Sequence, residues 1–205
     1  MFMYEEMLDQ FLDENSPTSE MPTAAVLAHF HLKALVLPET DETRNAMDSM
    51  YEQVMPDRVE EAAAGKEEIE NASGSELVRI MRRKVDPLNQ YAIVKRAMEL
   101  ESEVVPDVLR RFKNNRMDGF IEVATLVLGK SKIDIAGDII GFYDEMQNPY
   151  AQSMALLLLG FKADEDKIPW LISKYHELKK QYPREEFHEG AWYGLSEMHG
   201  RFYGT

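Results

Sequence analysis

The sequence predicts an all-α protein in which similar helical hairpins pack against one another, preceded by an irregular acidic helical segment. Apolar residues recur three or four positions apart along most of the 205 residues, as they do on one face of an amphipathic helix. In the second part of the chain, proline, glycine and capping residues interrupt this pattern at intervals of about 31 residues. A period of that length is typical of stacked pairs of helices.

Composition narrows the class of protein further. Hydrophobic residues make up 44% of the chain, enough to fill a core, and there is no cysteine. Disulfides and cysteine-based metal, iron–sulfur or thiol-nucleophile sites are therefore excluded. The first ten residues carry acids where a secretory signal would carry positive charge. No apolar run approaches the roughly 20 residues of a membrane helix, so we expect a cytoplasmic protein that does not span a membrane.

The net charge of −14 is concentrated in the first part of the chain. Residues 1–74 contain 17 acidic and 4 basic residues, whereas residues 75–205 contain 20 and 19. A general nucleic-acid binder needs clustered positive charge against the phosphates, so this distribution argues against one. It fits a solvated acidic face, or a surface that meets either a basic partner or a basic strip on the same chain.

Three short helices are expected in residues 1–56, the first predicted domain. The first would cover residues 1–14, the second would follow Thr23 and stop at Pro38, and the third would follow Thr40 or Asp41 and stop at Pro56. Their apolar faces consist of Tyr4, Met7, Leu8, Phe11 and Leu12 in the first helix, Val26, Leu27, Phe30, Ala34 and Leu35 in the second, and Ala46, Met47, Met50, Tyr51 and Val54 in the third.

Residues 57–74 are the clearest predicted boundary between domains. This stretch is rich in helix formers, but only Val59 and Ile69 are large and apolar, and Gly65 and Gly74 interrupt it. Two interpretations fit this pattern, an exposed helix and a mobile linker.

Residues 75–205 form the predicted repeat domain, which ends in a capping helix. Two helices would follow each of the first three breaks, and Gly160 would end the first helix of the third pair. The side chain of Asn148 would cap that helix and Pro149 would occupy its first position, where the missing N–H costs nothing. One capping helix would follow the last break, because the end of a repeat array needs a polar cover. The four breaks are Asp86-Pro87, Met117-Asp118-Gly119, Asn148-Pro149 and Tyr182-Pro183.

These repeats resemble the HEAT-repeat family, specifically the bacterial form called the phycobilisome-lyase HEAT-like repeat. The resemblance rests on Leu158-Leu159-Gly160 at the end of a first helix, Asp164 and Glu165 in the turn, and Ile168-Pro169-Trp170-Leu171-Ile172 at the start of the second helix. Val105-Pro106-Asp107-Val108-Leu109 repeats that start, whereas the middle repeat has Ala136 and Gly137 in place of the proline and the residue after it.

The resemblance implies an α-solenoid over roughly residues 75–205, with a surface that binds other macromolecules. The N-terminal helices would then cap the end of the stack opposite the C-terminal helix, or continue the stack irregularly. The family supplies no catalytic residues, and lyase activity does not follow from its name.

We find no catalytic constellation, cofactor motif or metal site in the sequence. The chain lacks the G-x-S-x-G turn of serine hydrolases and the G-x-x-x-x-G-K-[ST] phosphate loop. Glu185 and His188 have the i, i+3 spacing of a ligand pair on one helix face. Such a site needs a second pair, which is missing, so a solvated helix face is expected. His29 and His31 lie on different sides of a helix, so one would be packed and the other exposed.

One group of basic residues stands above the background. Each half of the group falls near the predicted end of a helix, where the helix dipole favours positive charge. If the helices stack in register, the side chains form one basic strip that could meet an acidic partner, a nucleic-acid backbone or the acidic N-terminal segment. The basic strip consists of Arg79, Arg82, Arg83 and Lys84 and, one repeat later, Arg110, Arg111, Lys113 and Arg116.

The sequence therefore favours a non-enzymatic protein–protein interaction module, a scaffold or adaptor that presents a groove or edge to a protein partner. One alternative is a DNA glycosylase or other DNA-binding protein on HEAT-like helices, with Trp170, Trp192 and an acid such as Asp166 around a damaged base. Such enzymes need a basic concave face, which the acidic composition disfavours. The other alternative is an acidic mimic of nucleic acid, in which residues 1–74 occupy a basic site on another protein.

Overall fold

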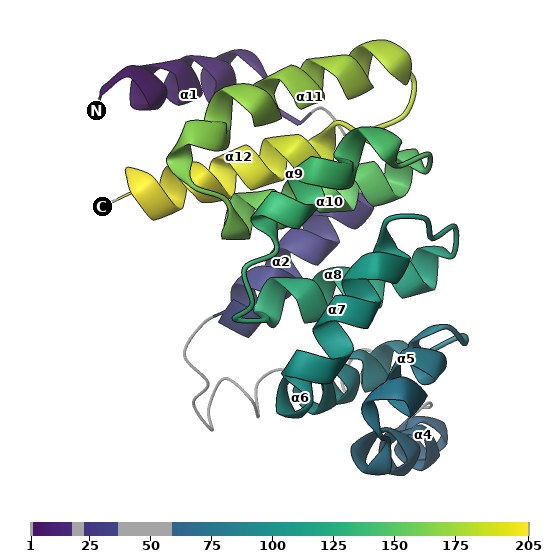
Figure 1. The fold of residues 1–205 in the computed structure, drawn as a ribbon. Coiled ribbons are helices and arrows are strands. Elements are labelled where there is room, and N and C mark those ends of the chain that lie inside the picture. The colour runs from purple at the N-terminus through teal and green to yellow at the C-terminus, as the bar shows by residue number, and fades with distance from the viewer. Residues whose placement is uncertain (1, 18–22, 37–58, 205) are drawn as a thin grey trace. The chain divides into compact units, whose positions relative to one another are not determined.

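The computed structural model describes residues 2–17, 23–36 and 59–204, and every regular element in these ranges is a helix (Figure 1). The prediction of an all-α protein is confirmed for this part of the chain. None of the helices described there is long and apolar enough to cross a membrane. The third helix predicted between Asp41 and Pro56 lies outside the described residues.

Contacts between residues group the chain into two compact units. The first unit comprises Met1–Phe30 and Asp134–Thr205, and the second unit comprises His31–Ile133. The division predicted from the sequence, at residues 57 and 74, follows a change in composition and stays a prediction.

The second unit is a set of helices connected by short turns. Before α6, the Oδ1 atom of Asp86 accepts a hydrogen bond from the backbone N–H of Leu88 at 3.0 Å, which caps the turn η2 as the Asp-Pro break predicts. The elements are the end of α2 (Ala24–Val36), then α4 (Val59–Asn71), α5 (Gly74–Met81), η2 (Pro87–Asn89), α6 (Gln90–Glu99), α7 (Glu101–Phe112) and α8 (Asp118–Lys130).

Alternate helices of the second unit are neighbours. Helix α6 contacts both α4 and α8, and α5 contacts α7. The beginnings of α5 and α7 lie together, because a Cβ atom built on Gly74 would fall only 2.4 Å from the carboxyl carbon of Glu103. Helices α5 and α7 are therefore neighbours, and their first turns lie close together.

Residues 57–74 contain a helix, the first of the two interpretations of this stretch. Helix α4 buries Ala62 and Ile69, whereas its glutamates at positions 67, 68 and 70 are exposed. The two apolar contacts position the helix even though few large apolar residues are available.

The first unit contains the second helix of the second predicted pair, both helices of the third pair, the C-terminal helix and helices near the N-terminus. As predicted, the Oδ1 atom of Asn148 accepts a hydrogen bond from the backbone N–H of Tyr150 at 3.0 Å, and Pro149 begins α10. The elements are α1 (Phe2–Glu14), the start of α2, α9 (Ala136–Phe142), η3 (Tyr143–Glu145), α10 (Pro149–Lys162), η4 (Glu165–Lys167), α11 (Ile168–Gln181) and α12 (Glu189–Phe202).

Gly160 does not end a helix, and that prediction is wrong. Helix α10 continues to Lys162, and Gly160 instead allows the backbones of α10 and α12 to meet. A Cβ atom on Gly160 would lie 2.3 Å from the Cα atom of Gly194, and one on Gly194 would lie 2.5 Å from the carbonyl oxygen of Leu156. A Cβ atom on Gly190 would lie 2.0 Å from the carbonyl oxygen of Ser153. The two helices therefore pack closely only because glycine has no side chain.

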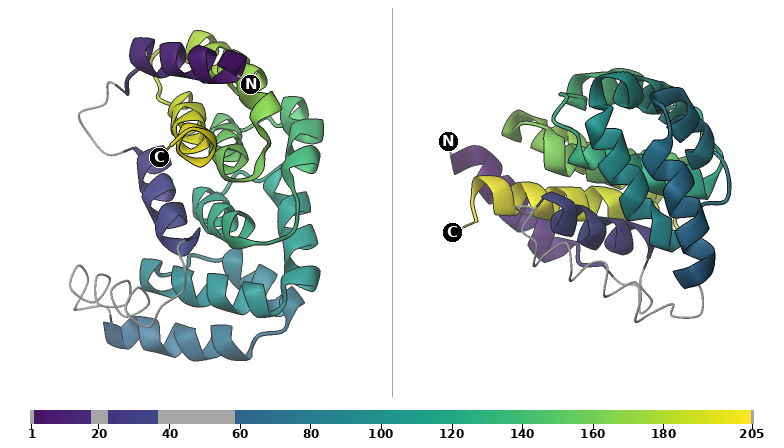
Figure 2. Two further views of the ribbon diagram at one scale, coloured as in Figure 1. Left: turned by 90° about the vertical axis from the view of Figure 1, so that its left-hand side faces the viewer. Right: turned by 90° about the horizontal axis from the view of Figure 1, so that it is seen from below.

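Helix α1 lies against α11 and α12, as the left view of Figure 2 shows. Leu8 and Phe11 are buried there, and the Phe11 ring meets the Tyr175 ring edge-on at a centroid distance of 4.9 Å. The expectation that this helix would cap the end opposite the C-terminal helix is therefore wrong, and an irregular continuation of the stack stays a prediction. Amphipathicity shows that a helix must be covered on one side, but it does not specify the covering surface.

We expect Gly194→Ala to lower the free energy of unfolding by about 1–3 kcal/mol, because the added methyl group has no space between the two backbones. Urea denaturation measures this change. The matched control is Gly200→Ala on the same helix, where a Cβ atom would meet nothing within 4 Å. That variant should be as stable as the wild type or more stable, by up to about 1 kcal/mol. Equal effects of the two substitutions would contradict the proposed role of Gly194.

Candidate interaction surface

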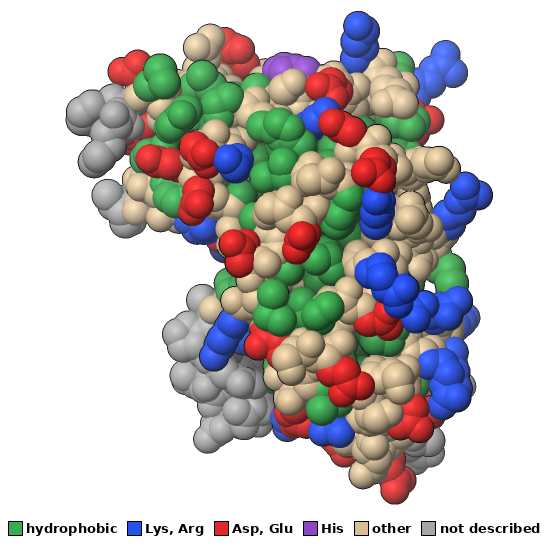
Figure 3. Space-filling view, viewed as in Figure 1, with side chains coloured by type: hydrophobic (Ala, Val, Ile, Leu, Met, Phe, Trp, Pro, Cys, Tyr) green, Lys and Arg blue, Asp and Glu red, His purple; other side chains and the backbone are tan. Residues whose placement is uncertain are grey.

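The structure brings the two halves of the basic strip to the ends of neighbouring helices. Arg79–Lys84 cover the end of α5 and the turn after it, and Arg110–Arg116 do the same for α7. Helices α5 and α7 are neighbours, and each group falls at the C-terminal end of its own helix. Figure 3 shows Lys and Arg side chains gathered on the right-hand side of the molecule, over the ends of these helices. Six of the eight are exposed, and Arg111 and Lys113 are half-buried.

Acidic residues of the second unit already neutralise part of the strip. Arg83 Nη1 lies 3.0 Å from Glu68 Oε1. Asp107 accepts hydrogen bonds from both Arg110 and Arg111, the latter at 2.9 Å. Partial burial works to raise the pKa of Asp107, but the two guanidinium groups outweigh it and hold that pKa below its usual value. These bonds weaken the positive field at the end of α7.

The end of α5 is the more accessible half of the strip. Arg82 and Lys84 are exposed, and neither has an ion pair with any residue that the structure describes. The C-terminal carbonyl groups of the helix favour these cations through the helix dipole. The strip can therefore exist without a partner, yet it leaves cationic groups that an acidic partner can reach.

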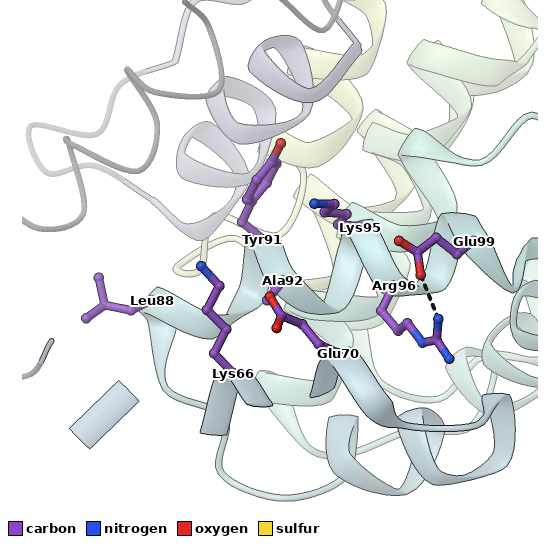
Figure 4. A pocket seen from close by; sticks show the side chains of 8 residues that line it. All are labelled: Lys66, Glu70, Leu88, Tyr91, Ala92, Lys95, Arg96 and Glu99. Atoms are coloured by element: carbon purple, nitrogen blue, oxygen red, sulfur yellow. Dashed lines mark hydrogen bonds and ion pairs between the residues drawn. The ribbon is translucent and has the colours of Figure 1, made fainter. Parts of the chain in front are cut away.

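A pocket of about 310 Å³ opens between α4 and α6 in the same unit (Figure 4). Lys66 and Glu70 line it from α4, and Tyr91 and Lys95 line it from α6. Arg96 at its edge is fixed in place, because it donates to the carbonyl oxygen of Ala72 at 2.9 Å and to Glu99 at 2.6 Å. The sequence does not reveal this pocket, because it shows a polar face on each helix but not that the two faces meet.

The metal-ligand pair considered from the sequence does not exist as a pair on a helix face. Helix α12 begins at Glu189, so Glu185 lies in the turn before it and His188 is only its N-cap residue. Glu185 and His188 therefore do not lie on one face of a helix, as their i, i+3 spacing predicted. In the described ranges, no three His, Asp or Glu side chains are grouped so that they could hold a metal ion.

The residues considered for a glycosylase have separate local partners. Asp166 is exposed and pairs with Lys167 at 2.7 Å. The Trp170 ring meets the Tyr143 ring edge-on at 5.2 Å, and Trp192 meets its neighbour Tyr193 in the same way. Each of these contacts is an ordinary packing or surface contact.

A buried lysine on α11 resembles an occupied cation site. Lys174 Nζ donates to Asp144 and to Glu177, each at 2.8 Å. The same atom lies 5.5 Å from the ring centre of Tyr143 and 5.6 Å from that of Trp170. Burial raises the pKa of the Tyr143 hydroxyl, so this tyrosine stays protonated. The chain supplies its own cation here, so the cluster joins η3 to α11 as a structural contact.

Helix α12 also binds the chain near the N-terminus through polar contacts that sequence analysis missed. The Thr23 hydroxyl donates to Glu189 Oε2 at 2.5 Å, and His29 Nε2 lies 3.2 Å from Glu197 Oε2. His29 is buried, as predicted for one of the two histidines, but His31 is half-buried, so the prediction that the other would be exposed is wrong. No local pattern could have revealed pairs that are more than 160 residues apart in the sequence.

Comparison with known proteins gives no match, either to a family model, to a curated protein or to a solved structure. The resemblance to HEAT repeats therefore stays a prediction. Function has to be argued from the geometry of the described surfaces.

We predict that Glu189→Gln stabilises the protein at pH 7. Burial raises the pKa of Glu189 despite the Thr23 hydrogen bond, so the folded state favours the protonated carboxyl group. Protonated Glu189 stabilises the folded state fully at pH values below the pKa of glutamate in the unfolded chain, about 4.3. This stabilisation is lost as the pH rises through the higher pKa of Glu189 in the folded protein. Glutamine stays neutral and keeps an acceptor for Thr23. Urea unfolding between pH 4 and pH 8 should show a gain that grows with pH.

The control is Glu70→Gln, an exposed change on α4, which should leave the pH dependence of unfolding unchanged. A Glu189→Gln protein that is less stable than the wild type at pH 7 would contradict the assigned effect of burial.

Proposed function

We propose that this chain is a non-enzymatic protein-interaction module, a short HEAT-like α-solenoid that binds an acidic partner protein through the basic strip. The observation that carries this proposal is the convergence of two basic groups, 31 residues apart in sequence, at the ends of two neighbouring helices. Either group alone is explained by its own helix dipole. Their placement side by side creates a broader positive surface than either helix needs.

The contacts in the second unit support the solenoid part of this proposal. In a solenoid, each helical pair buries its apolar face against the next pair, so first helices contact first helices and second helices contact second helices. The contacts of α6 with α4 and α8, and of α5 with α7, follow that rule.

An acidic protein segment fits the strip better than a nucleic acid does. Glu68 and Asp107 interrupt the positive charge, and continuous phosphate contacts would meet these carboxylates. A flexible acidic peptide can place its side chains between them. Aromatic residues for base stacking are also few near the strip, with Phe112 buried.

Binding of a fluorescent oligo-glutamate peptide to the full chain tests this proposal. We expect binding at 50 mM salt that weakens at 200 mM, since exposed charges are screened. Arg79→Glu, Arg82→Glu and Lys84→Glu together should weaken the affinity by about tenfold or more, or about 1.4 kcal/mol. Asp107→Asn should strengthen it, because the substitution frees two guanidinium groups.

The matched control reverses an exposed arginine of the first unit that lies on neither surface, Arg184→Glu, and should bind the peptide as the wild type does. Equal affinities for the strip variant and this control would contradict the proposal. Tighter binding of a 20-base-pair DNA duplex than of the peptide, or excision of alkylated bases, would favour the DNA-binding alternative.

A further inference from the structure

Helix α1 is attached to the first unit by a small set of contacts on α11 and α12. Leu8 and Phe11 are its only buried side chains among those described. Met3 and Met7 are 66% and 37% exposed on its outer side. Most of the helix is therefore in solvent, and few interactions oppose its release.

Charge and orientation make this contact specific. Asp9 Oδ1 lies 2.9 Å from His199 Nε2 of α12. Toward the start of α1, Glu5 is close enough to Tyr203 to act electrostatically on its hydroxyl group. Toward its end, the Phe11 ring meets Tyr175 of α11 edge-on. Helix α1 thus runs antiparallel to α12. Its acidic residue Asp9 contacts α12, and its apolar residue Phe11 contacts α11.

The surface beneath α1 is held in place by other parts of the unit. Helix α12 is fixed by its backbone contact with α10 and by packing against α11. The Tyr175 ring is also contacted by the His188 ring at 5.1 Å and by Lys179 Nζ, which lies 5.2 Å from the ring centre. We call the residues under α1, Tyr175, His176, His199 and Tyr203, the docking surface.

The docking surface favours an acidic helix. Its rim carries His176, His199 and Lys179, together with Glu165, which accepts a hydrogen bond from Tyr203 at 3.2 Å. Helix α1 contains five acidic residues and no lysine or arginine. The sequence of α1 therefore shows which kind of helix fits: a leucine and an aromatic residue three positions apart, with an acid between them.

We infer that α1 is a replaceable occupant of the docking surface, and that an acidic amphipathic helix of a partner protein binds there in its place. Recognition would follow the helix-in-groove principle, in which apolar anchors one turn apart supply the contact. Helix α1 would then act as an internal competitor that lowers the affinity for the partner. This inference concerns the first unit and does not depend on the basic strip of the second.

A labelled peptide with the sequence of residues 2–14 serves as the probe for such a partner helix. Its binding is measured by fluorescence anisotropy to the full chain and to a full-length Leu8→Ala, Phe11→Ala variant, in which α1 is loosened. We expect at least tenfold tighter binding to the variant, because its own α1 competes less. A peptide that carries the same two alanines is the matched control and should not bind.

Hydrogen exchange on the wild-type chain gives a second measurement that needs no variant. The amides of α1 should exchange faster than those of α10 and α12, because α1 leaves while the other helices stay packed. If the double variant does not fold, Asp9→Lys, which alters an exposed side chain, replaces it.

Two results would overturn the inference. One is the absence of peptide binding to a folded, loosened variant together with simultaneous exchange of α1 and α12. The other is dimerisation of the loosened variant with peptide binding lost in the dimer, which would make a second copy of the chain the occupant. Loss of oligo-glutamate binding alone would leave the inference standing, because it reports on the other unit.

Discussion

The backbone contact between α10 and α12 is the constraint on which the first unit depends. Gly160 and Gly194 leave no room for a side chain between these helices, so dispersion contacts extend along both backbones. Arg201 reinforces the contact, because its guanidinium donates to the carbonyl oxygens of Gly160 at 2.5 Å and Ala163 at 3.2 Å. It thereby satisfies carbonyl groups that the end of α10 leaves without helical partners.

With α12 fixed in this way, its polar face holds the chain near the N-terminus. Glu189 receives Thr23, Glu197 faces His29, and His199 faces Asp9. These pairs differ in environment, since the first two are buried or nearly so and the third is exposed. Exposed pairs of this kind contribute little stability, so the Asp9–His199 pair adds little to the attachment of α1. At least one acidic residue of the N-terminal segment, Asp9, thus pairs with a residue of the same unit.

The basic strip in the second unit is explained by a different interaction, that of positive charge with helix ends. Positive charge at the ends of α5 and α7 is favourable for each helix by itself, so its presence requires no partner. The internal pairs with Glu68 and Asp107 reduce the repulsion between the two groups. What needs a further explanation is that α5 and α7 lie side by side with exposed cations left over, and an acidic partner provides one.

The sequence by itself determined where the helices lie, because capping and periodicity act over a few residues. Asn148 and Asp86 cap their helical turns as predicted, and the eight residues of the basic strip were identified by their spacing. Predictions from the local sequence were wrong where the role of a residue depends on a contact with a distant part of the chain. Gly160 has the chemistry of a helix stop but allows α12 to approach, and Glu185 lies outside the helix on which its spacing with His188 was judged. Only the tertiary structure decided which faces meet, as with Phe11 on Tyr175, because such pairs depend on the shapes of whole helices and leave no trace in the neighbouring sequence.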